Sequence, residues 1–358
     1  GSLLECLQSN SRNGARYTLL MPGTDGPCRF GVYNLLNHIT LEQLGLQQRV
    51  RIWSPKDGDY FEGASGSLKM LIFSGCMAAD LLHEAMLDAR AAETERGAAQ
   101  EAYGLYGGEL LDLLRNAAQS NPSTRKSLWE VTHGGLFGIS DLLAEAARRF
   151  GALRRPTPLP TVLVVGEIYV RCDPFSNDGI IDKLEQRGLR VRRAPVYEWL
   201  EYCDYIGTRL QSPARFSVAL SSRLQRRIQS VTRRVVGEAL GWPAGHTVDK
   251  ALAAARPYLR DDVRGEAVLT IGHPVHEWRS GLIDGVVSVG PLECMPNKIA
   301  EAQFYHVAER EGLPSLTLSY SGEPLPTQSL DNFAFEVRAR FHRRMDRTNR
   351  GGRPQTAG

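Results

Sequence analysis

A repeated order of strand, loop, helix and strand constrains the fold of this chain more than any other feature. The run PTVLVVGEIYV (160–170) is apolar and rich in β-branched residues, which is typical of a strand buried on both faces of a parallel sheet. The polar loop RCDPFSND, a helix over 179–187 and a strand in LRVRRAP follow it. Because parallel neighbours need a crossover connection, this order predicts parallel sheets with helices on their faces.

The same order occurs twice more. Near the start, the apolar run 17–21 precedes the loop PGTDGPCRFG, a helix over 32–46 and a strand over 50–53. Near the end, the strand DGVVSVG precedes the loop PLECMPN, a helix over 298–310 and the strand SLTLSY. Apolar residues at helical spacing predict further helices. We therefore expect an α/β protein with Rossmann-like lobes, parallel sheets and helical insertions, the insertions lying over 68–94, 110–118, 136–150 and 216–240.

The length of 358 residues exceeds what one hydrophobic core usually supports. The proline-rich segment at 154–160 is typical of a hinge between lobes. We predict a first α/β lobe with a helical insertion over 1–157, which contains GPCRFG. A second α/β part over 158–345 contains PLECMPN, and 346–358, rich in Arg, Gly and Thr, is predicted to be a disordered tail.

Composition excludes several classes of protein. The net charge of +3 is too small to indicate a nucleic-acid partner. No uninterrupted apolar run reaches the roughly 18 residues that span a bilayer, and the first residues lack a signal-peptide pattern. No two of the six cysteines lie within ten residues of each other, which argues against zinc fingers, a CxxC motif and a dense disulfide framework. We expect a cytoplasmic protein with reduced thiols.

Cys28 is the first candidate site residue. It stands in GPCRFG, directly after a predicted strand and before a predicted helix, where open α/β sheets bind ligands. The helix N-terminus and Arg29 would favour its thiolate. The alternative interpretation is a buried structural cysteine, which is common for this residue type.

Cys294 occupies the equivalent position, in PLECMPNK after the last predicted β-branched strand. Two cysteines at corresponding strand-to-helix loops would face a common crevice. Such a pair suits a soft-ligand metal cluster better than zinc, because neither residue has a His or Cys neighbour at zinc-finger spacing.

These segments resemble a known family. GPCRFGVYN, GEIYVRCDPFSND, DGVVSVGPLECMPNK and LTLSYSGEPLPTQSLDNF are similar to the 2-hydroxyacyl-CoA dehydratase and double-cubane-cluster superfamily. The similarity is greatest to the C-terminal dehydratase-like region of large acyl-CoA dehydratase activase-related proteins, and it extends from Gly1 to about Arg343.

The resemblance implies an iron–sulfur cluster, of the [4Fe-4S] or double-cubane type, held by Cys28 and Cys294 as thiolates. It implies a partner activase ATPase that supplies an electron at low potential, and substrates of the acyl-CoA class. A dimer is also implied. The chain has no Gly-x-x-x-x-Gly-Lys phosphate loop, so we do not expect it to be the ATPase itself.

The sequence departs from the family pattern at two points. A third cysteine ligand would precede the segment that matches GSLLECL, so we expect the chain to be a fragment or one half of a split gene. Cys6 is a weak substitute because its segment has a helical pattern. Cys172 follows the central strand where relatives carry a polar residue, which makes it an additional candidate ligand.

Several neighbours of the cysteines have two interpretations. Glu167, Asp173 and Asn177 could orient a substrate or hydrogen-bond cluster sulfurs, or they could cap the following helix. Arg29 and Lys298 could offset the charge of a thiolate-ligated cluster, or they could form surface ion pairs.

The remaining candidates favour structural roles. His273 and His276 are three residues apart and could form a metal pair, but no third ligand is evident. Cys76 and Cys203 lie in helical patterns and are interpreted as core thiols. The basic tract over 223–234 is interpreted as a solvated helix face, with anion or nucleotide binding as the alternative.

Two other functions stay open. The chain could be a scaffold that docks activase domains without a cluster. It could instead be a cofactor-free protein that binds acyl-CoA or a nucleotide in a Rossmann-like crevice.

Overall fold

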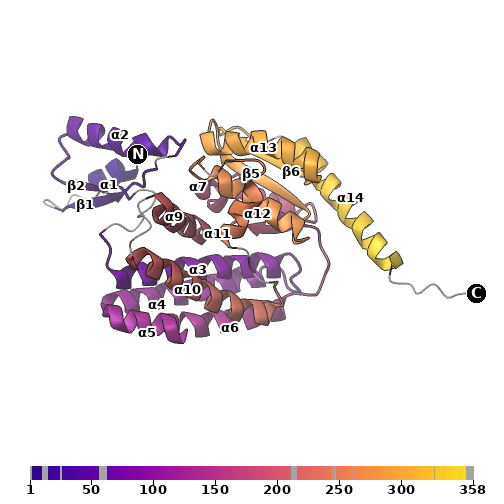
Figure 1. Cartoon of the computed structure of the whole chain (residues 1–358), viewed down its shortest axis with the longest axis horizontal. Helices are drawn as coiled ribbons and strands as arrows, with labels where there is room; N and C mark the ends of the chain where they lie inside the picture. Colours follow the sequence, from indigo (N-terminus) through magenta and orange to yellow (C-terminus); the bar gives the residue numbers. More distant parts are fainter. Residues whose placement is uncertain are drawn as a thin grey trace, which may run out of the picture.

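The computed structural model describes residues 2–9, 15–24, 26–55, 63–210, 216–243, 245, 247–260, 262–325 and 327–351. It confirms the predicted α/β class, with two parallel sheets and many helices. Figure 1 shows a small N-terminal unit, a layer of long helices, and a larger sheet with helices around it.

The N-terminal unit contains the two short strands that the sequence predicts. They pair in parallel from Tyr17 with Val50 to Leu20 with Trp53. Its small core consists of Leu7, Leu41 and Val50 with partly buried neighbours. Two strands alone make a marginal sheet, so this unit depends on further contacts. Its elements are α1 (Ser2–Ser9), β1 (Tyr17–Leu20), α2 (Phe30–Gln43) and β2 (Val50–Trp53).

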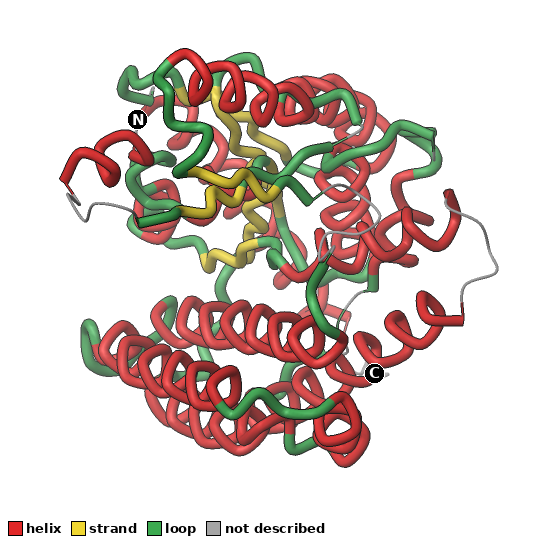
Figure 2. The backbone as a smooth tube through the Cα atoms, turned by 90° about the vertical axis from the view of Figure 1, so that its left-hand side faces the viewer, coloured by secondary structure: helices red, strands yellow, loops and turns green. Residues whose placement is uncertain are grey.

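Long helices form a bundle below the sheets in Figures 1 and 2. Its core includes Phe73, Met77 and Phe150 from the first half of the chain and Ile228 from the second. The bundle therefore joins parts of both predicted units, 1–157 and 158–345. Its elements are α3 (Gly66–Arg90), α4 (Ala98–Gln119), α5 (Thr124–His133), η1 (Leu136–Gly138), α6 (Ile139–Leu153) and α10 (Phe216–Leu240).

Helix α3 is the one helix in the described part of the chain that is long and apolar enough to cross a membrane. Of its most apolar stretch, 72% is buried inside the protein, against α4, α6 and α10. A helix at the centre of a bundle contacts neighbouring helices on most of its sides, which explains why α3 is apolar.

The larger sheet has four parallel strands in the order β4-β3-β5-β6. One face packs on α8 and α14 through residues such as Val164, Val289 and Phe333. The other face packs on α11, α12 and α13 through Val165 and Val286. This doubly wound arrangement confirms the prediction of a Rossmann-like lobe. Its elements are β3 (Thr161–Gly166), α7 (Ile168–Cys172), α8 (Ile180–Glu185), β4 (Arg190–Arg193), α9 (Tyr197–Leu210), α11 (Val248–Ala255), α12 (Ala267–Arg279), β5 (Gly285–Pro291), α13 (Met295–Glu311), β6 (Ser315–Tyr320) and α14 (Thr327–Gly351).

The predicted strand over 160–170 is wrong in its second half, because β3 ends at Gly166 and the helical turn α7 follows. Gly166 has φ +104°, and a Cβ there would lie 2.0 Å from the carbonyl oxygen of Val289. Only glycine allows this conformation and this close approach. Helix α13 begins at Met295, before its predicted start at 298, and α14 continues to Gly351, so the first residues of the predicted tail are helical. The last predicted tail residues, 352–358, lie outside the described residues.

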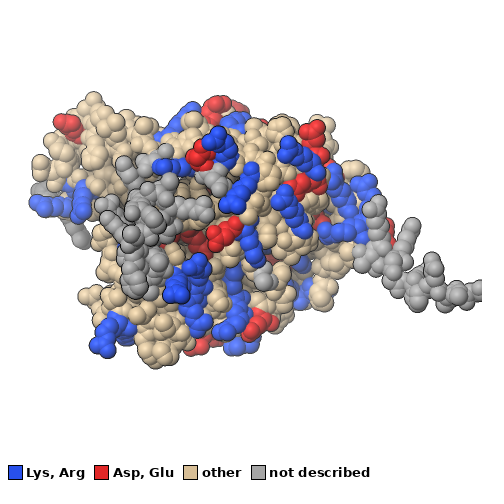
Figure 3. All heavy atoms as spheres, in the orientation of Figure 1, with Lys and Arg blue, Asp and Glu red and all other residues tan. Residues whose placement is uncertain are grey.

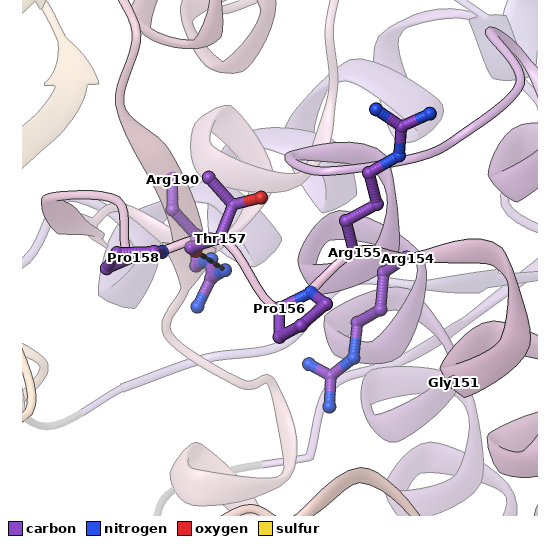
Figure 4. A pocket seen from close by; sticks show the side chains of 7 residues that line it. All are labelled: Gly151, Arg154, Arg155, Pro156, Thr157, Pro158 and Arg190. Atoms are coloured by element: carbon purple, nitrogen blue, oxygen red, sulfur yellow. Dashed lines mark hydrogen bonds between the residues drawn. The ribbon is translucent and has the colours of Figure 1, made fainter.

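The proline-rich segment connects α6 to β3 and borders a pocket (Figure 4). Arg154 ties it to the bundle by pairing with Asp88 and donating to the carbonyl oxygen of Leu240. Arg190 donates to the carbonyl oxygen of Thr157 at 3.1 Å. The side chains of Arg154 and Arg155 point to opposite sides, so the arginines do not converge on one anion.

Candidate functional site at the carboxyl end of the larger sheet

The order of the four strands defines where a ligand can enter. The connection after β3 runs along the sheet face that α8 covers, whereas the connection after β5 runs along the face of α13. The carboxyl ends of β3 and β5 therefore form a topological switch point. Doubly wound sheets bind ligands in the crevice at such a point.

Cys294 lies at this switch point as the N-cap residue of α13. The preceding residue, Glu293, has φ +61°, which is uncommon for a residue other than glycine and costs free energy. The pKa of Cys294 is raised to about 11, mainly by burial and to a lesser extent by negative charges on Glu266, Glu167 and Cys28, while the backbone N–H of Asn297 lowers it. Without a cation beside it, this thiol is protonated at neutral pH.

The loop of Cys28 approaches this end of the larger sheet from the N-terminal unit. This loop packs on the residues before α12: a Cβ at Gly26 would lie 2.8 Å from the carbonyl oxygen of Arg264. A charge on Cys28 acts on the pKa of Cys294, so the two thiols are within electrostatic range of each other. The structure thus brings together the two cysteines that the sequence analysis placed at corresponding loops.

A buried ion pair lies at the end of β3, and the sequence analysis did not identify it. Arg171 is only 4% exposed and donates to Glu266 at 3.0 Å and to the carbonyl oxygens of Gly166 at 2.7 Å and Pro195 at 3.1 Å. Burial raises the pKa of Glu266 to about 8, and Arg171 only partly offsets this effect. The pair holds α7 against the start of α12.

Cys172 has different surroundings from the other two candidate ligands. Burial raises its pKa, and the charges that act on it most are those of Arg193, Arg171 and Asp80, ahead of Glu167. Arg193 and Asp80 belong to the ion pairs between the sheet and the bundle, so the pKa of Cys172 depends on groups that do not act on that of Cys294 in the same order.

The other cysteines agree with the core interpretation. Cys203 is 1% exposed in α9, and burial raises the pKa of Cys76 in α3 to about 11. Cys6 lies in α1. Among the described side chains, every cysteine is a thiol that forms no disulfide: Cys28, Cys76, Cys172, Cys203 and Cys294.

The acidic and amide candidates after β3 are capping residues. Glu167 accepts a hydrogen bond from the backbone N–H of Val170 at 2.8 Å and caps α7. Asn177 is buried and accepts from the backbone N–H of Ile180 at 3.2 Å, at the start of α8. Asp173 accepts from the backbone N–H of Ser176 at 3.0 Å. The capping interpretation is confirmed for Asn177, whereas Glu167 caps α7 and not the helix near Asp178 for which capping was predicted.

The two basic neighbours of the cysteines lie on the surface. Arg29 is exposed at the start of α2. Lys298 is 45% exposed and forms an ion pair with Glu301 at 2.8 Å. Lys298 therefore forms a surface ion pair, which was the alternative interpretation. The cation that is buried near the end of β3 is Arg171.

The basic tract on α10 is mostly solvated, as predicted, but one of its arginines is an exception. Arg223, Arg226, Arg227 and Arg234 are exposed. Arg233 points inward, where its Nε donates to the hydroxyl of Tyr197 at 3.1 Å.

A network of buried ion pairs lies behind the crevice, between the bundle and the sheet. In its first part, Asp80 of α3 accepts from Arg193 at 3.0 Å and from the backbone N–H groups of Val196 at 2.7 Å and Tyr197 at 2.9 Å. These bonds join α3 to the end of β4 and the start of α9. Acidic residues such as Asp80 and Glu84 within the apolar pattern of α3 are the sequence signal that could have indicated the network.

In its second part, Arg192 donates to Glu84 at 3.0 Å and to Glu277 at 2.7 Å. His273 is 1% exposed and lies 3.1 Å from Glu198 and 3.3 Å from Glu277. Burial lowers its pKa, but the two carboxylates outweigh burial and raise it to about 9. His273 therefore has a structural role, as expected, rather than forming a metal pair with His276.

The network predicts that stability falls as pH rises. His273 has a pKa of about 9 in the folded protein against an ordinary value of 6.5, so its contribution is complete below pH 6.5 and is lost as pH rises through about 9. Glu266, with a pKa of about 8 against an ordinary 4.5, acts in the same direction. Urea unfolding between pH 6.5 and 9.5 should show a slope of up to about 1.4 kcal/mol per pH unit for each such proton.

The matched variants for this measurement are His273→Gln and His306→Gln. His306 is exposed on α13, so its replacement should leave the slope unchanged, whereas His273→Gln should reduce it. A wild-type stability that is independent of pH over this range would contradict the assignment of a protonated His273.

The two thiols by themselves are too few to hold a metal ion. In the part of the chain that the structure describes, no three His, Cys, Asp or Glu side chains form a group that could hold a metal ion. Comparisons with protein-family models, with curated proteins and with solved structures find no match to this chain.

Proposed function

We propose that this chain binds an iron–sulfur cluster through Cys28 and Cys294 and acts as a dehydratase-like redox protein beside an ATP-driven activase. The observation that supports the proposal is the position of Cys294 at the N-terminus of α13 and the switch point, within electrostatic range of Cys28 from the N-terminal unit. Thiolate sulfur is the ligand that such clusters require. The similarity of the surrounding motifs to the 2-hydroxyacyl-CoA dehydratase superfamily supports it.

The described residues supply only some of the ligands that such a cluster needs. Clusters of this kind usually take about four thiolates, and the described residues supply two in this crevice. Further ligands would come from another polypeptide, from residues outside the described part, or from a small thiol. Deprotonation of Cys294, whose pKa is about 11, would accompany metal binding, since a bound cation stabilises the thiolate.

When bound, the cluster would supply one-electron chemistry at low potential. Side chains and helix ends of this chain would determine the electrostatic environment of the cluster. The N-terminus of α13 stabilises negative charge beside Cys294, and Arg171 is a buried positive charge on α7, paired with Glu266. Acyl-CoA esters are the substrate class that we propose, and the cytoplasm is the proposed location.

Anaerobic reconstitution tests the two proposed ligands. With iron, sulfide and excess low-molecular-weight thiol, the wild-type chain should develop charge-transfer absorption in the visible region. Cys28→Ala and Cys294→Ala should each abolish most of it, because each removes a ligand. Cys172→Ala is the matched control, since Arg193 is the charge that acts most on the pKa of this thiol and the proposal does not assign it as a ligand, and it should keep the absorption. Equal absorption in all four proteins would contradict the assignment.

A second candidate function is a cluster-free protein that binds a ligand or docks activase domains. The small number of metal ligands among the described residues favours it, and the switch point remains a ligand site without any metal. Titration calorimetry with acyl-CoA esters and the metal-free chain distinguishes the two. Binding that persists in Cys294→Ala favours the cluster-free function, whereas binding only after reconstitution favours the cluster. Pull-down of an activase by the metal-free chain would indicate docking.

A further inference from the structure

The side-chain amide of Asn297 has an unused donor in a buried position. Asn297 lies in the first turn of α13 and is 3% exposed. Its Oδ1 accepts a hydrogen bond from the hydroxyl of Ser288 at 2.6 Å, whereas its Nδ2 has no hydrogen-bond partner among the described residues. Buried polar groups in native proteins nearly always have a partner, because an unpaired donor costs free energy. This donor therefore indicates an acceptor that a ligand supplies.

The unused donor is directed toward the carboxyl end of the sheet. Ser288 and Gly290 are alternate residues of β5, so they lie on the same face of the strand. A Cβ at Gly290 would lie 2.8 Å from the Nδ2 of Asn297, so only glycine leaves room for this atom at the end of β5. The Oδ1 atom lies deeper, at Ser288. The amide therefore directs its acceptor toward the middle of β5 and its donor toward the switch point.

The first turn of α13 offers few other donors to a ligand. The first N–H groups of a helix have no partner within the helix, but Pro296 has no N–H, and the N–H of Asn297 already interacts with the sulfur of Cys294. The N–H of Lys298 donates to the carbonyl oxygen of Cys294 at 2.9 Å. The backbone N–H of Met295 and the Nδ2 of Asn297 remain, beside the positive end of the helix dipole.

We propose that the Nδ2 of Asn297 and the N-terminus of α13 bind a phosphate group of a ligand that enters at the switch point. A strand, a short loop and a helix N-terminus form the arrangement that binds phosphate in doubly wound proteins. Ser288 is a positioning residue, because its hydroxyl holds the amide in the orientation that presents Nδ2. The proposal rests on the switch point as a ligand site and does not depend on a cluster.

The surrounding charges limit the strength of this binding. The carboxylates of Glu167 and Glu266 act on the neighbouring Cys294, and the buried guanidinium of Arg171 is already paired with Glu266. On the face that Figure 3 shows, Lys and Arg side chains are interspersed with Asp and Glu over the larger sheet, so no continuous basic surface attracts an anion there. Hydrogen bonds and the helix dipole would therefore hold the phosphate, and we expect a free phosphate ion to bind weakly.

Titration calorimetry of the metal-free chain with inorganic phosphate and with pyrophosphate tests the proposal. Both probes should bind to the wild type. Asn297→Leu should weaken both by about tenfold or more, because leucine has a similar shape but no donor and adds no charge. Ser288→Ala should weaken them by a smaller factor, because it only releases the amide. Asn116→Leu is the matched control: Asn116 is exposed on α4, and this variant should bind like the wild type.

Circular dichroism shows whether each variant is folded, and Ser288→Ala is the milder substitution to use if Asn297→Leu unfolds the chain. A wild-type chain that binds neither probe would overturn the proposal, as would acetate that binds as tightly as phosphate. Phosphate binding at wild-type strength in folded Asn297→Leu, or in Ser288→Ala where it alone is folded, would overturn it too. Because no iron is present, these results are independent of the test for a cluster.

Discussion

Replacement of Asp80 by Ala is expected to lower the free energy of unfolding by about 3–5 kcal/mol. Asp80 is 7% exposed and is the acceptor for Arg193 and for the backbone N–H groups of Val196 and Tyr197. Burial raises the pKa of its carboxyl, whereas Arg193 and the two backbone groups lower it. Its removal deprives a largely buried guanidinium and two backbone N–H groups of their acceptor, which is far costlier than the loss of an exposed ion pair.

Asp112→Ala is the control for this prediction. Asp112 also pairs with an arginine, Arg115, but both side chains are more than 60% exposed. Such exposed pairs contribute about 0–1 kcal/mol. Denaturant unfolding of the three proteins gives the comparison. Similar small effects of Asp80→Ala and Asp112→Ala would contradict the prediction. They would mean that the bonds of Asp80 contribute little to holding the bundle against the sheet.

The second large effect is expected at the buried ion pair near the end of β3. Arg171→Met removes the donor to Glu266, Gly166 and Pro195 and leaves the Glu266 carboxyl buried without its partner. We expect a loss of about 3–5 kcal/mol in the free energy of unfolding, because three buried acceptors lose their donor at once. The pKa of Glu266, about 8 with Arg171 present, should rise further, because Arg171 is the group that most strongly opposes the effect of burial.

A double-mutant cycle separates the pair from the other bonds of Arg171. The variant Arg171→Met with Glu266→Leu buries no charge at either position, so it should recover part of the stability, with a coupling energy of about 1–3 kcal/mol. Strictly additive losses would mean that the two side chains do not stabilise each other. Unfolding in urea at pH 7 measures all four corners of the cycle.

Much of the fold follows from local sequence. The β-branched runs that form β3 and β5 can be recognised because a strand buried on both faces is continuously apolar. Helix α10 occupies 216–240 as its spacing predicts. The end of β3 could not be predicted in this way, because it depends on the approach of Gly166 to Val289, more than a hundred residues later in the chain.

For the candidate site, only the loops that carry Cys28 and Cys294 could be predicted from the sequence. The positions of Cys28 and Cys294 after strands indicated a shared crevice because carboxyl ends of parallel strands lie at one edge. The buried pair of Arg171 and Glu266 joins residues 95 positions apart, and no local pattern distinguishes it from surface charge. Arg233 shows the same limit, since its basic neighbours are exposed while its own partners, Tyr197 and Glu84, come from other helices.

Iron and acid-labile sulfide content, measured on the anaerobically reconstituted chain in excess small thiol, tests the central claim most directly. We predict iron and sulfide in comparable molar amounts in the wild-type protein and in Cys172→Ala, and little of either in Cys294→Ala. An iron-free wild-type protein, or a Cys294→Ala variant that retains the full iron and sulfide content, would contradict the claim that Cys28 and Cys294 hold a cluster at the switch point of the sheet.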